Sequence, residues 1–409
     1  MKIALLVNEF PSSSETFIQS QMTGLLDRGH DVTIYTGSVS RDLCTHEDLS
    51  KYNLLGRTIC PAIPQQKFIR VLKGVRHILR VALKNPLPMI RALNVFRYRV
   101  NAASLTLLYQ VMPFLEHGSY DLIHCQFGTL GLQGLRIKQV LGGQPKLVTS
   151  FRGFDATMNV HNRPEMYKEL FAEGELFLPV SHSLKKRIVD QGCPEEKIVV
   201  LPSGIDCDKL TYARRTVAPG EQVRVMTIGR LVEKKGIAYA IEAMARVIES
   251  GRPATYDIVG EGVLRGQLER VIEERGMQTH IRLLGRRTHD ETIRLLQSAH
   301  MLMAPSITAA DGDQEGIPNV LKEAMALGLP VISTRHSGIP ELVEDGVSGY
   351  LVNERDVDAL ALRLSYLIDH PEKWAEMGKA GRACVETNYD IKALNDRLVA
   401  LYEQLHVKT

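Results

Sequence analysis

The sequence lacks any apolar run long enough to cross a membrane or to form the core of a secretion signal. Its first run, Ile3–Val7, has five apolar residues before Asn8 and Glu9, which suits a buried strand. Cysteine is also scarce, and the six cysteines show neither metal-ligand spacing nor the spacing of a disulfide framework. We therefore expect reduced thiols, no zinc site and a cytoplasmic location.

Acidic residues are missing from one long stretch. Between Leu49 and Leu115 there is no Asp or Glu but there are eleven Lys or Arg, so the stretch carries +11 and the rest of the chain −8, against +3 in total. Six of these cations recur every three or four residues between apolar ones, at Lys67, Arg70, Lys73, Arg76, Arg80 and Lys84. This period predicts a basic amphipathic helix. Such a helix can lie on an anionic membrane surface, attract an anionic substrate, or pack on a core with a solvated basic face.

Strand-like and helix-like segments alternate through the remaining sequence. Strands are expected near 3–8, 31–35, 121–124, 146–150 and 176–180, and again near 224–228, 255–259, 281–284, 300–304, 330–333 and 350–352. Helices are expected at about 15–28, 235–250, 263–275, 289–298 and 317–327. Continuous apolar strands between helices predict an α/β protein made of doubly wound parallel sheets. In such sheets, ligands bind beyond the carboxyl ends of the strands.

A chain of 409 residues is too long for one ordinary core, so two domains are expected. Pro, Gly and charged residues cluster at 205–222, which places the boundary there. We assign residues 1–205 to the first domain and 206–385 to the second. A final helix at about 391–409 has an apolar stripe, and we expect it to pack back on the first domain.

A loop and helix between Asp311 and Glu323 read DGDQEGIPNVLKE. Gly316 frees the backbone at the turn, and Pro318 suits the first helical position, where its missing N–H costs nothing. The amides at the start of this helix would face a diphosphate. Glu315 precedes the helix and Glu323 lies within it, so one carboxylate could bind hexose hydroxyls and the other ribose hydroxyls.

Two cations flank the first strand of the second domain in TIGRLVEKKG. Arg230 leaves the carboxyl end of the strand and Lys235 opens the next helix, so together they could neutralise a diphosphate. Glycine turns at 258–262 and 283–287 could admit a nucleotide base. The pair Asp311–Asp313 could chelate a metal, but Arg230 and Lys235 already supply positive charge, so a polar loop is the preferred interpretation.

These motifs together resemble a large family of retaining glycosyltransferases (family 4, glycosyl transferases group 1). The segments that carry the resemblance are Thr227–Gly236, Ile258–Gly262, Leu283–Arg286, Glu315–Glu323 and PVISTRHSGIPELVEDGVSGYLV at 330–352. The first domain is similar to the exopolysaccharide branch, of colanic-acid or amylovoran type, through NEFPSSSETFI at 8–18 and SFRGFD at 150–155. The resemblance implies the GT-B fold, in which two Rossmann-like domains face each other across a cleft.

The resemblance also implies roles for single residues. Arg230 and Lys235 would bind the donor diphosphate, Glu315 the donor sugar and Glu323 the ribose. The donor-binding candidates are Arg230, Lys235, Arg286, Gly316, Ile317, Pro318, Asn319 and Glu323. The acceptor-side candidates are Ser14, Glu15, Arg152 and Asp155. Glu315, Arg230, Lys235 and Arg152 are the catalytic candidates. Many members of the family have His where this chain has Arg152, and an arginine would stabilise charge or bind sugar hydroxyls rather than titrate.

The resulting hypothesis is a hexosyltransferase, peripheral on the cytoplasmic face of the inner membrane and bound there by the basic 49–115 stretch. It would move sugar from a UDP- or GDP-sugar to a lipid-linked oligosaccharide in bacterial exopolysaccharide biosynthesis, without a metal cofactor or a nucleic-acid partner. Two alternatives remain: a sugar-nucleotide epimerase on the same fold, and a non-catalytic scaffold subunit of a polysaccharide assembly complex. His124, at a strand end, is interpreted as packed rather than catalytic.

Overall fold

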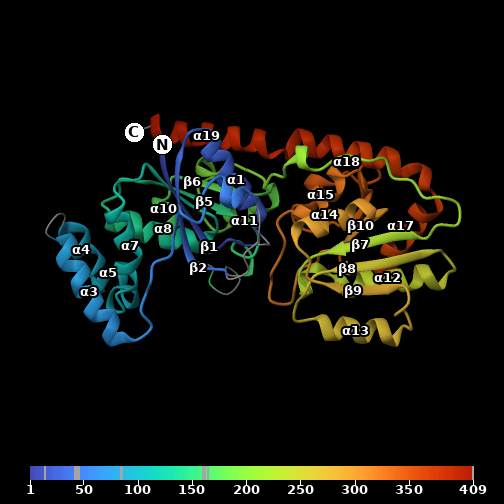
Figure 1. Ribbon diagram of the computed structural model, residues 1–409, viewed down its shortest axis with the longest axis horizontal. Coiled ribbons are helices and arrows are strands. Elements are labelled where there is room, and N and C mark those ends of the chain that lie inside the picture. Colours follow the sequence, from blue (N-terminus) through green and yellow to red (C-terminus); the bar gives the residue numbers. More distant parts are fainter. Residues whose placement is uncertain (13–14, 41–46, 83–85, 159–162, 164, 408–409) are drawn as a thin grey trace.

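The computed structural model describes the chain except for residues 13–14, 41–46, 83–85, 159–162, 164 and 408–409. Two α/β domains lie side by side, and two long helices run along the top of both (Figure 1). The N- and C-terminal ends of the chain lie close together over the first domain (Figure 1). The five cysteines of the described part are free thiols.

The first domain is built on a parallel sheet of six strands in the order β3-β2-β1-β4-β5-β6. Its strands are β1 (Lys2–Phe10), β2 (Asp31–Val39), β3 (Thr58–Ile59), β4 (Leu122–Cys125), β5 (Lys146–Phe151) and β6 (Leu176–Pro179). The main helices against it are α1 (Thr16–Asp27), α7 (Thr106–Glu116), α8 (Gly128–Val140), α10 (Lys168–Glu173) and α11 (His182–Asp190). The strand order reverses between β1 and β4, so a crevice for ligands is expected beyond their carboxyl ends.

The second domain repeats this topology in the order β12-β11-β10-β7-β8-β9. Its strands are β7 (Val223–Ile228), β8 (Ala254–Val259), β9 (Ile281–Gly285), β10 (Met301–Ala304), β11 (Val331–Thr334) and β12 (Gly349–Val352). Its helices are α12 (Ile237–Glu249), α13 (Arg265–Glu274), α14 (His289–Ser298), α15 (Asn319–Ala326), α16 (Ile339–Leu342) and α17 (Val357–Asp369). The reversal here lies between β7 and β10. The prediction of two doubly wound Rossmann-like domains is confirmed.

A group of helices departs from the regular alternation of strands and helices. Between β3 and α7 the chain forms α3 (Lys67–Ala82), α4 (Pro86–Ala92), α5 (Val95–Tyr98) and α6 (Val100–Ala103), which we call the helical insert. It projects from the outer side of the first domain (Figure 1). The basic amphipathic helix predicted from Lys67 onward is α3, although residues 83–85, with the predicted Lys84, lie outside the described chain. Among the described residues, no helix is both long enough and apolar enough to cross a bilayer.

The chain passes between the domains twice, and the two crossings touch. Helices α18 (Trp374–Asn388) and α19 (Ile391–Val407) form the long feature along the top of the molecule (Figure 1). Between them, Ile205 of the outgoing crossing donates to Tyr389 O at 3.0 Å and accepts from Ile391 N at 2.9 Å. Helix α19 then packs on α1 and contributes Leu394, Leu398 and Tyr402 to the core of the first domain.

Candidate active site

Loops from the carboxyl ends of both sheets meet where the domains face each other. The backbones approach so closely that a Cβ at Gly316 would lie 2.6 Å from the carbonyl oxygen of Arg152, and one at Gly153 would lie 2.8 Å from that of Gln314. Any larger residue at these two positions would push the loops apart. The loop at 314–316 of the second domain therefore lies directly against the SFRGFD turn of the first.

Further contacts across the boundary hold the loops in register. The carboxylate of Glu341 in α16 accepts the backbone amides of His182 and Ser183, at 2.8 and 2.9 Å, at the start of α11. This places a negative charge at a helix N-terminus, where it is stabilising. Arg187 in the same helix donates to Gln314 Oε1 at 2.7 Å.

Glu315 lies at the centre of a buried group of charges. Its Oε1 is 3.2 Å from Lys235 Nζ and 3.4 Å from Lys234 Nζ, and Lys234 also lies 3.0 Å from Asp313 Oδ2. Burial alone would raise the pKa of Glu315, but the attraction of Lys235 and Lys234 lowers it to about 2. The carboxylate is therefore charged at neutral pH, and it neutralises a lysine expected to bind a diphosphate.

Lys235 and Pro318 each lie just before the helix that the sequence predicts them to begin. Lys235 ends a short 3-10 turn, Glu233–Lys235, and α12 begins only at Ile237. Pro318 precedes the first helical residue of α15 with φ −60° and ψ 125°, because its extended backbone leads the loop into Asn319. Lys235 Nζ nevertheless lies 3.2 Å from Glu315 Oε1.

The other donor-side candidates follow the same edge of the second domain. Gly316 and Ile317 lead into α15, where Asn319 Oδ1 accepts from Lys322 at 2.9 Å. Arg230 and Arg286 are exposed and follow β7 and β9.

Glu323 lies one turn into α15 and is partly exposed. Burial of its carboxyl group raises its pKa, while the charges of His289 and Lys322 lower it. Lys322 beside it is fully buried, and its Nζ donates to Ser203 O at 2.6 Å. Burial lowers the pKa of Lys322 to about 7, against the opposing charge of Glu323. This lysine ties α15 to the segment that connects the domains.

Arg152 extends from the first domain into the same region and is held on several sides. Its Nε donates to Gln126 O at 3.0 Å, its Nη1 to Ser203 Oγ at 2.7 Å, and its Nη2 to Gln126 Oε1. The guanidinium also lies 4.5 Å from the centre of the Phe17 ring. Burial lowers its pKa to about 10, whereas Asp155 and Glu15 raise it. Arg152 is thus charged and rigidly placed.

The two domains share Ser203. Its hydroxyl accepts from Arg152 of the first domain, and its carbonyl accepts from Lys322 of the second. Because Ser203 is bonded to both domains, a motion of one domain relative to the other would have to break at least one of these two hydrogen bonds.

Asp155 has a different role from the one predicted on the acceptor side. Its carboxylate is fully buried and accepts three backbone amides, from Gly128 at 2.8 Å and from Arg152 and Gly153 at 2.9 Å each. Burial raises its pKa and the three amides lower it. Because its oxygens are occupied, the structure assigns Asp155 to shaping the SFRGFD turn rather than to facing an acceptor.

The two remaining acceptor-side candidates lie before α1. Ser14 falls outside the described residues. Glu15 is half-buried at the start of α1; burial raises its pKa, and the nearby charges of Arg152 and Arg230 lower it. Since Arg230 belongs to the second domain, Glu15 lies within electrostatic reach of the donor side.

His124 is a packed residue, as interpreted from the sequence. Its Nδ1 lies 2.6 Å from Tyr402 Oη and its Nε2 2.8 Å from Ser150 Oγ, so it joins α19 to the sheet. Burial lowers its pKa to about 3. Within the described part of the chain, no three His, Cys, Asp or Glu side chains form a group that could hold a metal ion, and Asp313 is paired with Lys234.

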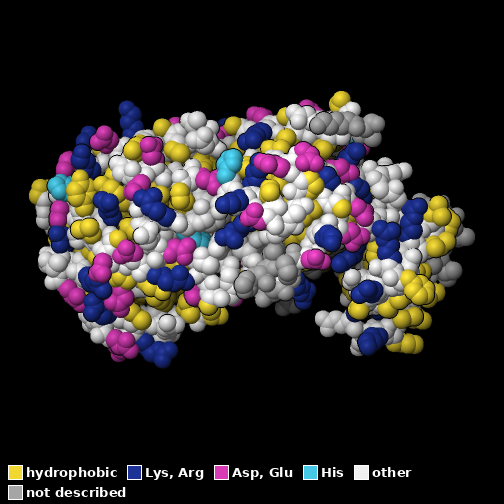
Figure 2. Space-filling model, turned by 180° about the vertical axis from the view of Figure 1, so that it is seen from behind, with side chains coloured by type: hydrophobic (Ala, Val, Ile, Leu, Met, Phe, Trp, Pro, Cys, Tyr) yellow, Lys and Arg dark blue, Asp and Glu magenta, His cyan; other side chains and the backbone are white. Residues whose placement is uncertain are grey.

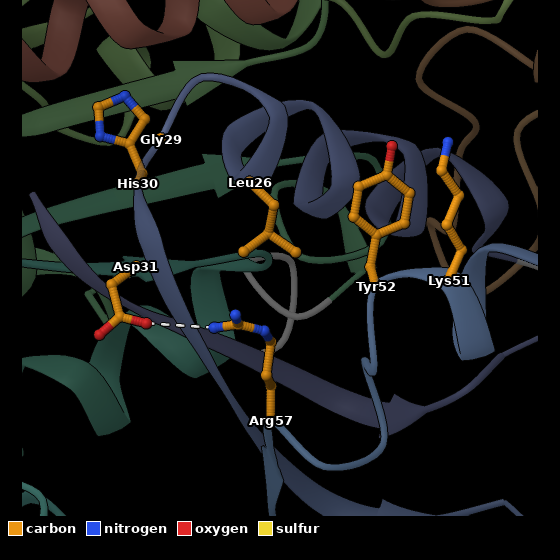
Figure 3. Close-up of a pocket in the computed structure, with 7 residues that line it drawn as sticks. All are labelled: Leu26, Gly29, His30, Asp31, Lys51, Tyr52 and Arg57. Carbon is orange, nitrogen blue, oxygen red and sulfur yellow. Dashed lines mark hydrogen bonds and ion pairs between the residues drawn. The ribbon is translucent and has the colours of Figure 1, made fainter.

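A cavity of about 450 Å³ lies elsewhere on the first domain (Figure 3). Leu26, Gly29, His30, Asp31, Lys51, Tyr52 and Arg57 line it, and Arg57 pairs with Asp31 at 3.2 Å. It opens at the amino end of β2, whereas the candidate site lies at the carboxyl ends of the strands. Its position therefore separates it from the site built around Glu315.

Sequence reasoning missed several residues that shape the site. Lys234 is more deeply buried than the predicted Lys235, and the adjacent lysines of EKKG were the only signal for it. Gln126 and Ser203, which hold Arg152, carry no motif. His336 lies within the quoted run at 330–352, but nothing in its spacing showed that its ring would accept the amide of Glu315.

Comparison with known proteins gives consistent matches along the chain. A family described as "Glycosyltransferase Family 4" matches residues 14–209, and one described as "Glycosyl transferases group 1" matches residues 208–383. The amylovoran biosynthesis glycosyltransferase AmsK of Erwinia amylovora is 34% identical, over 99% of this chain and 100% of the relative. WcaL of Escherichia coli K12, named as a colanic acid biosynthesis glycosyltransferase, is also 34% identical, with coverage of 99% and 100%.

Solved structures share the whole architecture. HepE from Anabaena, in complex with UDP and glucose, has a TM-score of 0.72 and 18% identity and covers 99% of this chain and 100% of its own. Sucrose-phosphate synthase from Thermosynechococcus elongatus has a TM-score of 0.73 and 18% identity, and covers 100% of both chains. At this level of identity the likeness shows the fold.

Proposed function

Because this chain belongs to the family 4 glycosyltransferases with the GT-B fold, we propose that it transfers a hexose from a nucleotide sugar to a lipid-linked oligosaccharide, with retention of configuration, in exopolysaccharide assembly. The family membership agrees with the resemblance predicted from the sequence. Relatives named for amylovoran and colanic acid biosynthesis support the exopolysaccharide context.

The observation that carries the proposal is the buried contact of Lys234 and Lys235 with Glu315, at the strand ends that face the first domain. In the free protein, each charge of this group is satisfied by another. A donor diphosphate would bring at least two negative charges, which compete with Glu315 for Lys235. Glu315 would then be free to accept hydrogen bonds from hydroxyl groups of the sugar that follows the diphosphate.

The chemistry then rests on stabilising the departing diphosphate. Arg230 and Lys235 would bind the charge that develops as the bond between sugar and phosphate breaks. The leaving phosphate oxygen can take the proton of the acceptor hydroxyl on the same face of the sugar, so retention requires no protein nucleophile. Because lysine and arginine supply the positive charge, we expect transfer without a metal ion.

The donor is proposed to be a UDP- or GDP-sugar. A solved structural neighbour, HepE, is described in complex with UDP-glucose, with 17% identity to this chain. Glu323, a partly exposed residue of α15, is the proposed ribose ligand.

The helical insert supports an acceptor held at a membrane. Among the side chains of the insert that the structure describes, ten large apolar ones are exposed: Phe68, Ile69, Val71, Leu72, Val75, Leu87, Ile90, Val95, Phe96 and Val100. Lys and Arg side chains stand among them, and Figure 2 shows apolar and basic side chains together on the projecting lobe. The whole 49–115 stretch contains no acidic residue. Mixed apolar and cationic surfaces of this kind bind anionic lipid surfaces, and we propose the cytoplasmic face of the inner membrane.

The direct test is a transfer assay with a panel of UDP- and GDP-sugars and a polyprenyl-diphosphate-linked glycan, in EDTA and in magnesium. We expect one donor to yield an elongated lipid-linked product in both conditions, and Lys235→Ala to abolish it. The outcome that contradicts the proposal is an active donor whose sugar is converted to an epimer without any acceptor, which would establish the epimerase alternative. Full complementation by a Glu315→Ala, Lys235→Ala double variant would establish the scaffold alternative.

A further inference from the structure

Two strand ends of the second domain present a histidine and a carboxylate behind Glu315. His336 stands two residues after β11, and Glu354 two residues after the neighbouring strand β12. The residue that follows each of them has a positive φ although it is not glycine, 47° at Ser337 and 65° at Arg355. Such backbone is unfavourable for L-residues and persists where surrounding contacts hold it. The backbone beyond each strand is thus held in an unusual conformation directly after His336 and Glu354.

The imidazole of His336 bridges Glu354 and the backbone of Glu315. Its side chain is 1% exposed, its Nδ1 lies 2.6 Å from Glu354 Oε1, and its Nε2 lies 3.1 Å from the amide nitrogen of Glu315. An amide N–H can only donate, so Nε2 must accept and the ring proton must sit on Nδ1. Burial lowers the pKa of His336, although Glu354 and Glu315 oppose this effect, which keeps the ring neutral as the geometry requires.

Glu354 also binds Thr308, at the beginning of the loop that leads to Glu315. Its Oε2 accepts the amide of Thr308 at 2.8 Å, and its Oε1 lies 3.3 Å from the Thr308 hydroxyl. The segment from Thr308 to Glu315 is therefore tied to one carboxylate at both ends, directly at the first and through His336 at the second. Gln314, just before Glu315, donates to the Thr308 hydroxyl at 3.0 Å.

We propose that His336 is a positioning residue for sugar transfer: in its Nδ1-protonated form, held by Glu354, it fixes the backbone of Glu315 and so aims the Glu315 carboxylate at the donor sugar. This inference rests on the proposed function, because it assigns the sugar contact to Glu315. The charged groups around the ring are Glu354 and Arg355 beyond β12, Glu315 with Lys234 and Lys235 on its far side, and Arg187 of α11.

Two substitutions of His336, each by a residue with a side-chain amide, distinguish the contact of Nε2 from the contact of Nδ1. The amide of Gln reaches the position of Nε2, so His336→Gln keeps an acceptor for the Glu315 amide. The amide of Asn reaches only the position of Nδ1, so His336→Asn keeps the partner of Glu354 and leaves the Glu315 amide unpaired. We expect His336→Asn to lower kcat/KM by about 10- to 100-fold through misplacement of the carboxylate. We expect His336→Gln to stay within about threefold of wild type.

UDP binding serves as a control for the diphosphate site, whose cations Arg230 and Lys235 are present in both variants, and thermal unfolding measures the stability lost with the unpaired Glu315 amide. We expect the Kd for UDP to change by less than about twofold in both variants. Wild-type kcat/KM in His336→Asn, or an equal loss in both variants, would overturn the inference.

A measurement on the wild-type protein is independent of transfer. Nitrogen-15 histidine NMR at pH 7, with the His336 signal identified by its loss in His336→Asn, should show a protonated Nδ1 and an unprotonated Nε2. A protonated Nε2 would overturn the inference even in a protein with full activity. If no donor and acceptor support transfer by the wild-type protein, the proposed function fails, and the NMR result still reports on His336.

Discussion

Binding of the helical insert to an anionic membrane can be tested with substitutions that the structure selects. Arg70 lies in the basic series of α3, but its Nε donates to Pro64 O at 2.7 Å and its Nη1 to Ser104 O at 3.2 Å, so its removal would damage the insert itself. Lys67 and Lys73 are exposed instead. Phe96 is 99% exposed and offers an apolar side chain with no cost to the core when it is truncated.

The expected magnitudes follow from these exposures. Each cation near an anionic surface contributes about 1 kcal/mol, so Lys67→Gln with Lys73→Gln should weaken vesicle binding by about 2 kcal/mol, or about 30-fold. Full burial of a Phe side chain in an apolar medium is worth about 1.5–3 kcal/mol. Phe96→Ala should therefore weaken binding by roughly tenfold or more. The lysine effect should shrink as salt is raised, and the Phe96 effect should not.

Co-sedimentation with vesicles containing phosphatidylglycerol, compared with neutral phosphatidylcholine vesicles, measures both effects. A matched control is Lys373→Gln with Lys379→Gln, which removes the same charge from exposed positions of the second domain. The control should bind like wild type. If both pairs of substitutions weaken binding equally, the protein is attracted by its net charge alone, and the reasoning about the insert is refuted.

Further predictions concern the site. Lys235→Ala should weaken UDP-sugar binding by about 1.5–3 kcal/mol, the value of a hydrogen bond to a charged group, and calorimetry with Lys73→Ala as control would measure it. Gly316→Ala should reduce transfer because its methyl group meets the Arg152 carbonyl; unchanged kcat/KM would show that the loops can separate freely. The pKa of Glu315 is lowered from 4.5 to about 2, so its stabilisation is complete above pH 4.5 and is lost as pH falls towards 2. Denaturant titrations should show Glu315→Gln losing less stability than wild type over that range. Tyr402→Phe should cost about 1–3 kcal/mol of unfolding free energy by leaving His124 with a buried unpaired nitrogen.

The parallel strands were predictable because they are buried on both faces. The run Ile3–Val7 is continuous and apolar, and it became the middle of β1, all of it at most 2% exposed. β3, at Thr58–Ile59, was missed because a pair of residues leaves no pattern in the sequence. Helices α4 to α6 were missed for a related reason: with seven residues or fewer, each is too short to show a helical period.

The sequence indicated candidate residues for the site but could not show their contacts. The motifs indicated Glu315 and Lys235, and the sheet topology places both in loops that follow strand ends. Lys234 and Lys235 are the same residue type at adjacent positions, so only the fold shows that Lys234 pairs with Asp313 as well as with Glu315. Asp155 looked available for an acceptor because the sequence does not show which backbone amides will surround a carboxylate. The amides that occupy it come from Gly128, Arg152 and Gly153.

The two neighbouring chain crossings at Ile205 and Ile391 bear on whether the second domain can be exchanged by protein engineering. Because the chain leaves the first domain and re-enters it at neighbouring points, the second domain is an insertion whose two ends meet. Such a unit can be cut out at both crossings and replaced by the corresponding unit of a relative without lengthening either connection. Grafting this one continuous segment, with α19 left in place to complete the first domain, would therefore move the proposed donor-binding domain as a unit between related glycosyltransferases.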